Sequence, residues 1–379
     1  MMLEVLFWLC ALGACYSYFL YPAILLLAPA RRWPSEPQPV TLAPPRVAVI
    51  VASRNESAKI AQKLDNTLAL DMAGAELEII VASDASDDGM DDIVRSYADR
   101  GVRLVRAAER KGKENAQGLA IGATTAEVLV FTDTGTILPP EAVRNLLRIF
   151  RDPFIGAVSS VDRFISPDGS MQGEGLYVRY EMWLRDREAR FFSLVGLSGS
   201  FFAARRKVCE DWDTGVPSDF GTALNCARLG LRAVSDRDVV GYYKNISDPS
   251  KEFQRKVRTV TRGMMGLRRR SEVLNPVRFG RFSFEVFSHK LMRWAVPWFL
   301  AGALCTNVLL LSHELYRWLL AAQLAFYAVP LLSRAVPAIL KFAPLRLCAF
   351  FVDVNVAIAY STVLALSGRS MLTWEPSKR

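Results

Sequence analysis

Long apolar stretches at both ends of the chain restrict its possible folds more than any other feature. One near-continuous stretch covers residues 3–29, and three more cover residues 294–311, 315–333 and 347–366. Each is close to the ~20 residues that an α-helix needs to cross a bilayer. The region between them, roughly residues 45–275, has the mixed, periodic composition of a globular domain. We therefore expect one globular domain held between membrane-spanning helices.

The first apolar stretch has two interpretations, a cleaved signal peptide or a membrane anchor. Ala28-Pro29-Ala30 is similar to a small-residue cleavage site, but the apolar run is too long and no positive charge precedes it. Arg31 and Arg32 follow directly, which favours an uncleaved anchor with the next residues in the cytoplasm. The proline-rich residues 34–45 then predict a stiff linker.

These features divide the chain into six segments. We expect an anchor at residues 1–30, a linker at 31–45 and a cytoplasmic globular domain at 46–270. An interfacial amphipathic segment at 271–293, membrane helices at 294–367 and a tail at 368–379 are expected to follow. The expected location is the inner (cytoplasmic) membrane, as a multi-pass protein. Four spans place the tail outside, although it carries Arg369, Lys378 and Arg379. Whether one apolar stretch is interfacial or re-entrant stays open.

The charge and the cysteines exclude some classes of protein. A net charge of +9 indicates either a basic face for anionic lipids and phosphates or the ordinary positive flanks of membrane spans. Nucleic-acid binding is not expected, because no recognised binding motif accompanies the charge. The six cysteines show no paired spacing, so neither a zinc site nor a disulfide framework is predicted.

Strand-like and helix-like segments alternate through the middle of the chain. Apolar runs predict strands at residues 47–51, 77–81, 102–105 and 128–132, and helical spacing predicts helices at 58–70, 90–100 and 113–124. This alternation predicts an α/β fold with a parallel sheet. Three of the strands end in polar residues, which should converge on a ligand at one edge of the sheet. Neither a Gly-rich dinucleotide motif nor a Walker lysine motif is present.

Asp133 is the most informative of these polar residues. It follows the apolar run 128–131 and precedes Thr134-Gly135-Thr136. A carboxylate at a strand end is well placed to hold a hard cation and, through it, a phosphate. The alternative is that Asp133 is only a turn residue after a strand.

Several motifs, taken in order, resemble the membrane-bound family 2 glycosyltransferases, which include cellulose, chitin and hyaluronan synthases. The motifs are Val49–Glu56, Val81–Gly89, Lys111-Gly112-Lys113, the Asp133 segment, the turn Gly199–Arg206, and Asp219. One motif alone is weak, whereas the ordered set across residues 45–270 is specific. The resemblance implies a GT-A nucleotide-diphospho-sugar transferase domain with one N-terminal and about three C-terminal transmembrane helices.

The resemblance also implies site residues. Those expected to bind the donor substrate are Ser53, Arg54, Asn55, Glu56, Asp84, Lys113, Gly199, Arg255 and Arg258. Asp133 is expected to hold Mg²⁺ or Mn²⁺, and Asp219 to act as the general base of an inverting transfer. Plainer interpretations stay open: Asp84 and Asp219 as helix caps or turn residues, Lys113 as a solvated surface lysine, and the arginines as part of a basic interfacial helix.

Three positions depart from the pattern of this family. Many nucleotide-sugar enzymes have a second acid where this chain has Gly135, and the family commonly has Asn where this chain has Gly118. Losing a carboxylate weakens the binding of a hard cation. The Gln-x-x-Arg-Trp motif of processive synthases is not intact, because Gln254 and Arg258 are one residue too far apart and no Trp follows.

Two functions are compatible with these observations. The first is an inverting glycosyltransferase that moves a sugar from a UDP- or GDP-sugar to a polysaccharide or lipid-linked acceptor, in contact with membrane lipids. The second is a catalytically silent relative that binds nucleotide sugar or serves as a scaffold for envelope-assembly proteins. Asp84, Asp133 and Asp219 favour the first function, whereas Gly118 and Gly135 favour the second.

Overall fold

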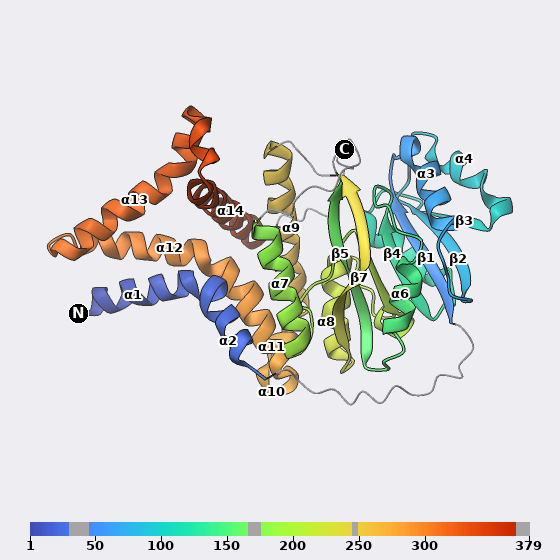
Figure 1. Ribbon diagram of the computed structural model, residues 1–379, viewed down its shortest axis with the longest axis horizontal. Coiled ribbons are helices and arrows are strands. Elements are labelled where there is room, and N and C mark those ends of the chain that lie inside the picture. Colours follow the sequence, from blue (N-terminus) through green and yellow to red (C-terminus); the bar gives the residue numbers. More distant parts are fainter. Residues whose placement is uncertain (30–44, 166–175, 245–248, 369–379) are drawn as a thin grey trace. The chain divides into compact units, whose positions relative to one another are not determined.

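The computed structural model describes residues 1–29, 45–165, 176–244 and 249–368 (Figure 1). The chain forms two compact units. One contains a β-sheet and comprises residues 28–247, 265–283 and 371–379; the other contains the apolar helices and comprises residues 1–27, 248–264 and 284–370.

The first unit is built on a seven-stranded mixed sheet in the order β3-β2-β1-β4-β6-β5-β7. Its strands are β1 (Arg46–Ser53), β2 (Glu76–Ser83), β3 (Val102–Arg106), β4 (Val128–Asp133), β5 (Ile155–Ile165), β6 (Phe201–Arg205) and β7 (Arg232–Lys244). Strands β3, β2, β1 and β4 are parallel, as the alternating pattern predicted, whereas β6 is antiparallel to both of its neighbours.

Helices cover both faces of this sheet, because successive residues of a buried strand point to opposite sides. Val49 of β1 packs in one core with Leu64, whereas the adjacent Ile50 packs in a second core with Ala120. The helices of the unit are α3 (Ser57–Leu68), α4 (Met90–Arg95), α5 (Lys113–Gly122), α6 (Ala142–Ile149), α7 (Leu176–Phe191), α8 (Ser218–Arg228) and α10 (Pro276–Phe279), with 3-10 turns at Ala98–Arg100, Arg206–Val208 and Ser271–Leu274.

The strand register brings three loops to the same edge of the sheet. Ser53 at the end of β1 lies opposite Ser83 at the end of β2, and Ala52 lies opposite Asp133 at the end of β4. The polar segments that follow these strands therefore start side by side, as expected for a ligand site at the carboxyl edge of parallel strands.

The second unit consists of helices. They are α1 (Met2–Cys15), α2 (Tyr21–Leu27), α9 (Pro249–Arg269), α12 (Met292–Leu309), α13 (Glu314–Ala335) and α14 (Ala343–Leu366), with π-helical turns at Tyr16–Leu20 and Phe287–Leu291 and a 3-10 segment at Pro337–Lys341; α9 and α11 (Arg281–Val286) each extend across the boundary of the units. Three helices are long and apolar enough to cross a membrane: Met2–Leu27, α13 and α14. The prediction of about three C-terminal spans is therefore reduced to two candidates among the described residues. Helix α12 covers most of the remaining predicted stretch, residues 294–311, and is not among the three candidates.

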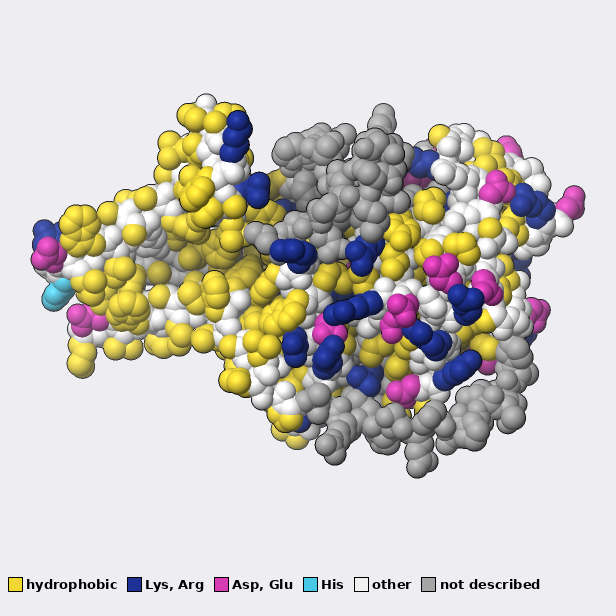
Figure 2. Space-filling view, in the orientation of Figure 1, with side chains coloured by type: hydrophobic (Ala, Val, Ile, Leu, Met, Phe, Trp, Pro, Cys, Tyr) yellow, Lys and Arg dark blue, Asp and Glu magenta, His cyan; other side chains and the backbone are white. Residues whose placement is uncertain are grey.

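Close contacts between small and aromatic residues hold α1 against α12. A Cβ atom at Gly13 would lie 2.8 Å from the ring of Phe299, and one at Gly302 would lie 2.8 Å from Sγ of Cys10. The Gln323 amide of α13 donates a hydrogen bond to the carbonyl of Leu300 (3.3 Å). Hydrophobic side chains cover much of the visible surface of these helices in Figure 2, which suits contact with lipid acyl chains.

Candidate active site

A hollow at the carboxyl edge of the sheet collects five of the residues predicted to form a site. It is lined by Ala52, Ser53, Arg54, Ala82, Asp84, Lys113, Ala116 and Asp133. These residues come from the ends of β1, β2 and β4 and from the first turn of α5. The ordered motifs of the sequence therefore meet in space.

Asp84 is buried and holds the loop before α5. Its side chain is 3% exposed, and its Oδ1 accepts hydrogen bonds from the backbone N–H groups of Lys111 (2.9 Å) and Gly112 (3.0 Å). The N-cap position of α4 is Gly89, so Asp84 does not cap that helix. Asp84 instead fixes the backbone from which Lys113 reaches into the hollow.

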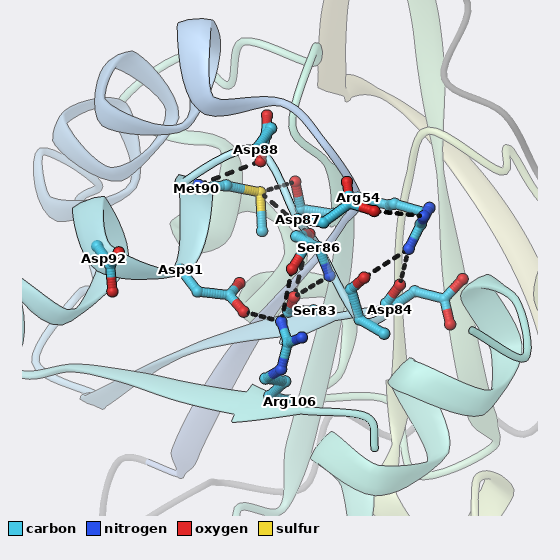
Figure 3. Close-up of polar contacts among 12 residues, drawn as sticks. Arg54, Ser83, Asp84, Ser86, Asp87, Asp88, Met90, Asp91, Asp92 and Arg106 are labelled. Atoms are coloured by element: carbon cyan, nitrogen blue, oxygen red, sulfur yellow. Dashed lines mark hydrogen bonds and ion pairs between the residues drawn. The ribbon is translucent and has the colours of Figure 1, made fainter. Parts of the chain in front are cut away.

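Two arginines hold the loop after β2 in place (Figure 3). Nη1 of Arg54 donates to the carbonyls of Asp84 and Ala85, both at 2.6 Å. Arg106 pairs with the carboxylate of Asp91 and donates to the carbonyl of Ser86 at 2.7 Å. Arg54, predicted as a substrate-binding residue, thus has a structural role that the sequence did not reveal.

Asn55 and its neighbours also contact this loop. The Asn55 amide donates to Oδ1 of Asp87 (2.6 Å) and accepts from the Asp87 N–H (3.0 Å). Glu56 occupies the N-cap position of α3 without a side-chain capping bond, and Asp88 accepts the N–H of Ser57 (2.9 Å) in its place. Burial raises the pKa of Asp88, but backbone hydrogen bonds, first that from Ser57, lower it overall. A nucleoside-binding role for Asn55 and Glu56 stays a prediction.

Lys113 is the central cation of the hollow. Its Nζ donates to Oδ1 of Asp133 (2.5 Å) and to the carbonyl of Gly199 (2.8 Å), and its side chain is 18% exposed. It is therefore not a solvated surface lysine. Burial lowers the pKa of Lys113, but the charges of Asp133, Glu114 and Asp219 and the hydrogen bond to Asp133 raise it overall.

Asp219 lies on the other side of Gly199. A Cβ atom at Gly199 would be 3.4 Å from Oδ2 of Asp219, so the two residues are close neighbours. Asp219 is in the first turn of α8, whose N-cap is Pro217 with no side-chain capping bond. The interpretation of Asp219 as an N-cap is therefore wrong, and Lys113 links the Asp133 and Asp219 regions.

Two residues of this region were missed from the sequence. Asp162 of β5 accepts hydrogen bonds from the hydroxyls of Ser198 (2.7 Å) and Ser200 (2.8 Å), which fixes the turn around Gly199. Lys63 of α3 is fully buried beneath the Asp133 segment. In the sequence, its burial was indicated by its position on the apolar face of α3, one residue before Leu64.

Lys63 binds the backbone and side chain on either side of Asp133. Its Nζ donates to Oγ1 of Thr132 (2.9 Å) and to the carbonyl of Thr136 (2.6 Å). Burial lowers the pKa of Lys63 to about 7, although the charge of Asp133 acts in the opposite direction. The segment 132–136 is thus held between two lysines.

The two glycines that depart from the family pattern differ in their surroundings. A Cβ atom at Gly118 would be 3.2 Å from Cδ1 of Trp212, whose ring stacks on Phe131 at 5.2 Å. Close packing against Trp212 therefore accounts for a glycine at position 118 without any loss of activity. Next to Gly135, in contrast, no atom lies within 4 Å of an added Cβ atom.

The residues offer limited ligands to a metal ion. No group of three or more His, Cys, Asp or Glu residues that could hold a metal occurs in the part of the chain that the structure describes. Asp133 supplies the carboxylate that is hydrogen-bonded to Lys113. Arg255 and Arg258 lie on α9 among residues 248–264 of the helical unit, and their predicted contact with a diphosphate stays a prediction.

Part of the chain is similar to proteins of a known family. Residues 48–213 match the model of the Glycosyl transferase family 2 domain. An N-acetylglucosaminyltransferase of Bradyrhizobium diazoefficiens is 28% identical over 206 residues, which cover 50% of this chain and 42% of that protein. The Succinoglycan biosynthesis protein ExoO of Rhizobium meliloti is 28% identical over 127 residues, which cover 33% of this chain and 35% of that protein. The chain thus spans less than half the length of these two relatives.

A solved structure is similar over almost the whole chain. It is a mannosyltransferase of Pyrobaculum calidifontis in complex with GDP-Man and Mn²⁺, with a TM-score of 0.75 and 24% sequence identity, covering 97% of this chain and 100% of that one. This similarity shows a GT-A fold, and it extends beyond the sheet-containing unit.

Proposed function

Because residues 48–213 form a family 2 glycosyltransferase domain, we propose that the protein transfers a sugar from a nucleoside diphosphate sugar to a glycan or lipid-linked acceptor, with inversion at the anomeric carbon. The observation that carries this proposal is the convergence of Asp84, Lys113 and Asp133 on one hollow, with Asp219 next to Gly199. The donor is a UDP- or GDP-sugar.

The proposed reaction is a displacement at the anomeric carbon in which Asp219 and Lys113 have different roles. The acceptor hydroxyl attacks the anomeric carbon, and the bond from that carbon to the diphosphate breaks with its electron pair leaving on the phosphate. Asp219 takes the acceptor proton as general base. Lys113 faces the negative charge that develops on the leaving diphosphate.

A divalent cation is held weakly by this site alone and more firmly together with a phosphate ligand. Asp133 would hold it, because its carboxylate is 34% exposed and Mg²⁺ commonly uses one or two carboxylates plus substrate oxygens and water. When bound, Mg²⁺ or Mn²⁺ supplies Lewis-acid stabilisation of the leaving diphosphate.

The helical unit supports a place for this reaction at a membrane. The three long apolar helices would anchor the protein, and Arg31 and Arg32 after the first of them favour a catalytic domain on the cytoplasmic side of the inner membrane. A lipid-linked acceptor would then be available in the same membrane, and envelope-assembly proteins would be natural partners of the protein.

Replacement of the proposed base tests the function. We expect Asp219→Asn to lower sugar transfer by ~10²–10⁴-fold in purified membranes, with little change in donor binding. Asp65→Asn is the matched control, because Asp65 is an exposed carboxylate on α3 that pairs with Arg100. Asp219→Asn with the activity of the parent would refute the assignment. A parent that binds a sugar nucleotide but never turns one over would favour the silent scaffold.

A further inference from the structure

The carboxylate proposed to hold a metal ion already has a cationic partner within the chain. Lys113 Nζ is 2.5 Å from Oδ1 of Asp133 and 2.8 Å from the carbonyl of Gly199. A divalent cation ligated by the same Oδ1 would lie close to this ammonium group. Two cations at that distance repel each other strongly where water screens them little.

The other oxygen atoms of the segment have partners as well. The Thr132 hydroxyl and the Thr136 carbonyl accept hydrogen bonds from Lys63. The Thr134 hydroxyl donates to the Ser53 hydroxyl at 2.8 Å. Around Asp133, the chain thus offers a cation few oxygens that are not already hydrogen-bonded.

The carboxylate of Asp133 has a cationic partner without a metal ion. Two carboxylates would carry a charge of −2, which a divalent cation neutralises. In this chain Gly135 leaves one carboxylate, and the single charge of Lys113 neutralises it. The ammonium group of Lys113 therefore neutralises the charge of Asp133, as a divalent cation neutralises the charge of two carboxylates.

We propose that Lys113 and a divalent cation are alternative partners of Asp133, so that this chain binds a nucleoside diphosphate without a metal ion. The proposal rests on the proposed function and adds a regulatory feature to its donor site. With no metal bound, Lys113 stays on Asp133 and presents its positive charge to the diphosphate. A divalent cation that binds Asp133 has to displace it.

Binding of Mn²⁺ alone tests the competition without any substrate. The free Mn²⁺ signal in electron paramagnetic resonance is measured for the full-length protein in detergent. Removing the competing charge with Lys113→Met should tighten Mn²⁺ binding by about tenfold, because the affinity of such sites follows their charge. Lys113→Arg keeps the charge and should bind Mn²⁺ like the parent. Lys111→Met is the matched control, since its side chain is 62% exposed and pairs with Glu109.

The second part of the proposal, nucleotide binding without a metal ion, is tested by calorimetry of GDP and UDP binding in EDTA and in Mn²⁺. For the better-bound nucleotide, we expect the affinity of the parent to differ by less than about threefold between the two conditions. Lys113→Met should lose about tenfold or more in EDTA, as expected when a charged partner of phosphate is removed, and recover in Mn²⁺. A parent that needs Mn²⁺ for binding, or a Lys113→Met variant with unchanged Mn²⁺ affinity, would overturn the proposal.

The two proposals fail in different ways. If correctly folded parent protein binds neither nucleotide in either condition, both the proposed function and metal-free binding are refuted. If nucleotide binds without Mn²⁺ but no sugar is transferred, the function fails while the exchange at Asp133 stands. Circular dichroism of each variant excludes loss of the fold as the cause.

Discussion

The polar segments at the ends of β2 and β4 lie on either side of β1 at the same edge of the sheet, yet they are stabilised by different kinds of contact. In the loop after β2, Asp84 and Asp88 accept backbone N–H groups, and Arg54 binds backbone carbonyls. At the end of β4, where the second loop begins, the carboxylate of Asp133 accepts a hydrogen bond from the side-chain ammonium group of Lys113. Backbone contacts fix the first loop, whereas a flexible side chain can leave the second. The first loop can therefore present a rigid surface to a ligand. At the second loop, a divalent cation can take the place of Lys113 on Asp133, as proposed above.

The largest expected effect concerns Lys63, beneath the second loop. Its folded pKa of about 7 is below the ordinary value of 10.5, so the unfolded chain binds more protons between these pH values. The stability of the parent relative to Lys63→Met should therefore rise with pH, by about 1.4 kcal/mol per unit between about pH 7 and 10.5. Below pH 7, where both states are protonated, the difference should stay constant.

Urea unfolding of the full-length protein in detergent, measured for parent and Lys63→Met from pH 6 to 10, checks this prediction. Because both proteins share every other titrating group, the difference between their unfolding free energies isolates Lys63. A difference that does not change with pH would show that Lys63 is not buried beneath the Asp133 segment.

The next effect tests whether the first loop is held by its carboxylates. Asp84→Ala leaves the N–H groups of Lys111 and Gly112 without their acceptor, so the free energy of unfolding should fall by about 2–3 kcal/mol. Asp92→Ala is a suitable control, because the Asp92 side chain is exposed and pairs only within its own helix. If Asp84→Ala costs no more than this control, the first loop is not fixed in the way described.

The smallest expected effect adds a carboxylate to the second loop. Gly135 is not in the left-handed region of backbone conformation, and space is open where its Cβ would lie. Gly135→Asp should therefore leave the stability unchanged and tighten Mn²⁺ binding by about tenfold, through the added ligand charge. Ser at the same position tests the effect of side-chain size alone. Mn²⁺ binding as weak as in the parent would mean that residue 135 does not face the cation.

Much of the sheet followed from the sequence, because buried parallel strands appear as short apolar runs. The expected run 128–132 is β4, and the expected run 47–51 is the centre of β1. The antiparallel direction of β6 could not be predicted, since an apolar run has no direction relative to its neighbours. The candidate membrane helices were recognised from length and apolarity, but two rather than about three of them lie in the C-terminal part of the described residues.

The convergence of the candidate residues was predictable from the sequence, whereas their contacts were less so. Order along the chain brought Asp84, Lys113 and Asp133 together correctly, because strand ends at one edge must converge. That Asp84 holds the backbone of residues 111–112 depends on a contact between distant segments. Lys63 was missed for a related reason: a lysine is usually exposed, and only its place on an apolar helix face indicated burial.

The most direct test of the account is turnover of a panel of UDP- and GDP-sugars by the purified full-length protein in membranes, read out as release of UDP or GDP with Mn²⁺ and with EDTA. We expect release of UDP or GDP from at least one donor, with inverted configuration in the transferred sugar. Asp219→Asn should strongly reduce this release. Tight binding of nucleotide with no release from any donor would contradict this expectation, and would indicate a catalytically silent relative of the glycosyltransferases.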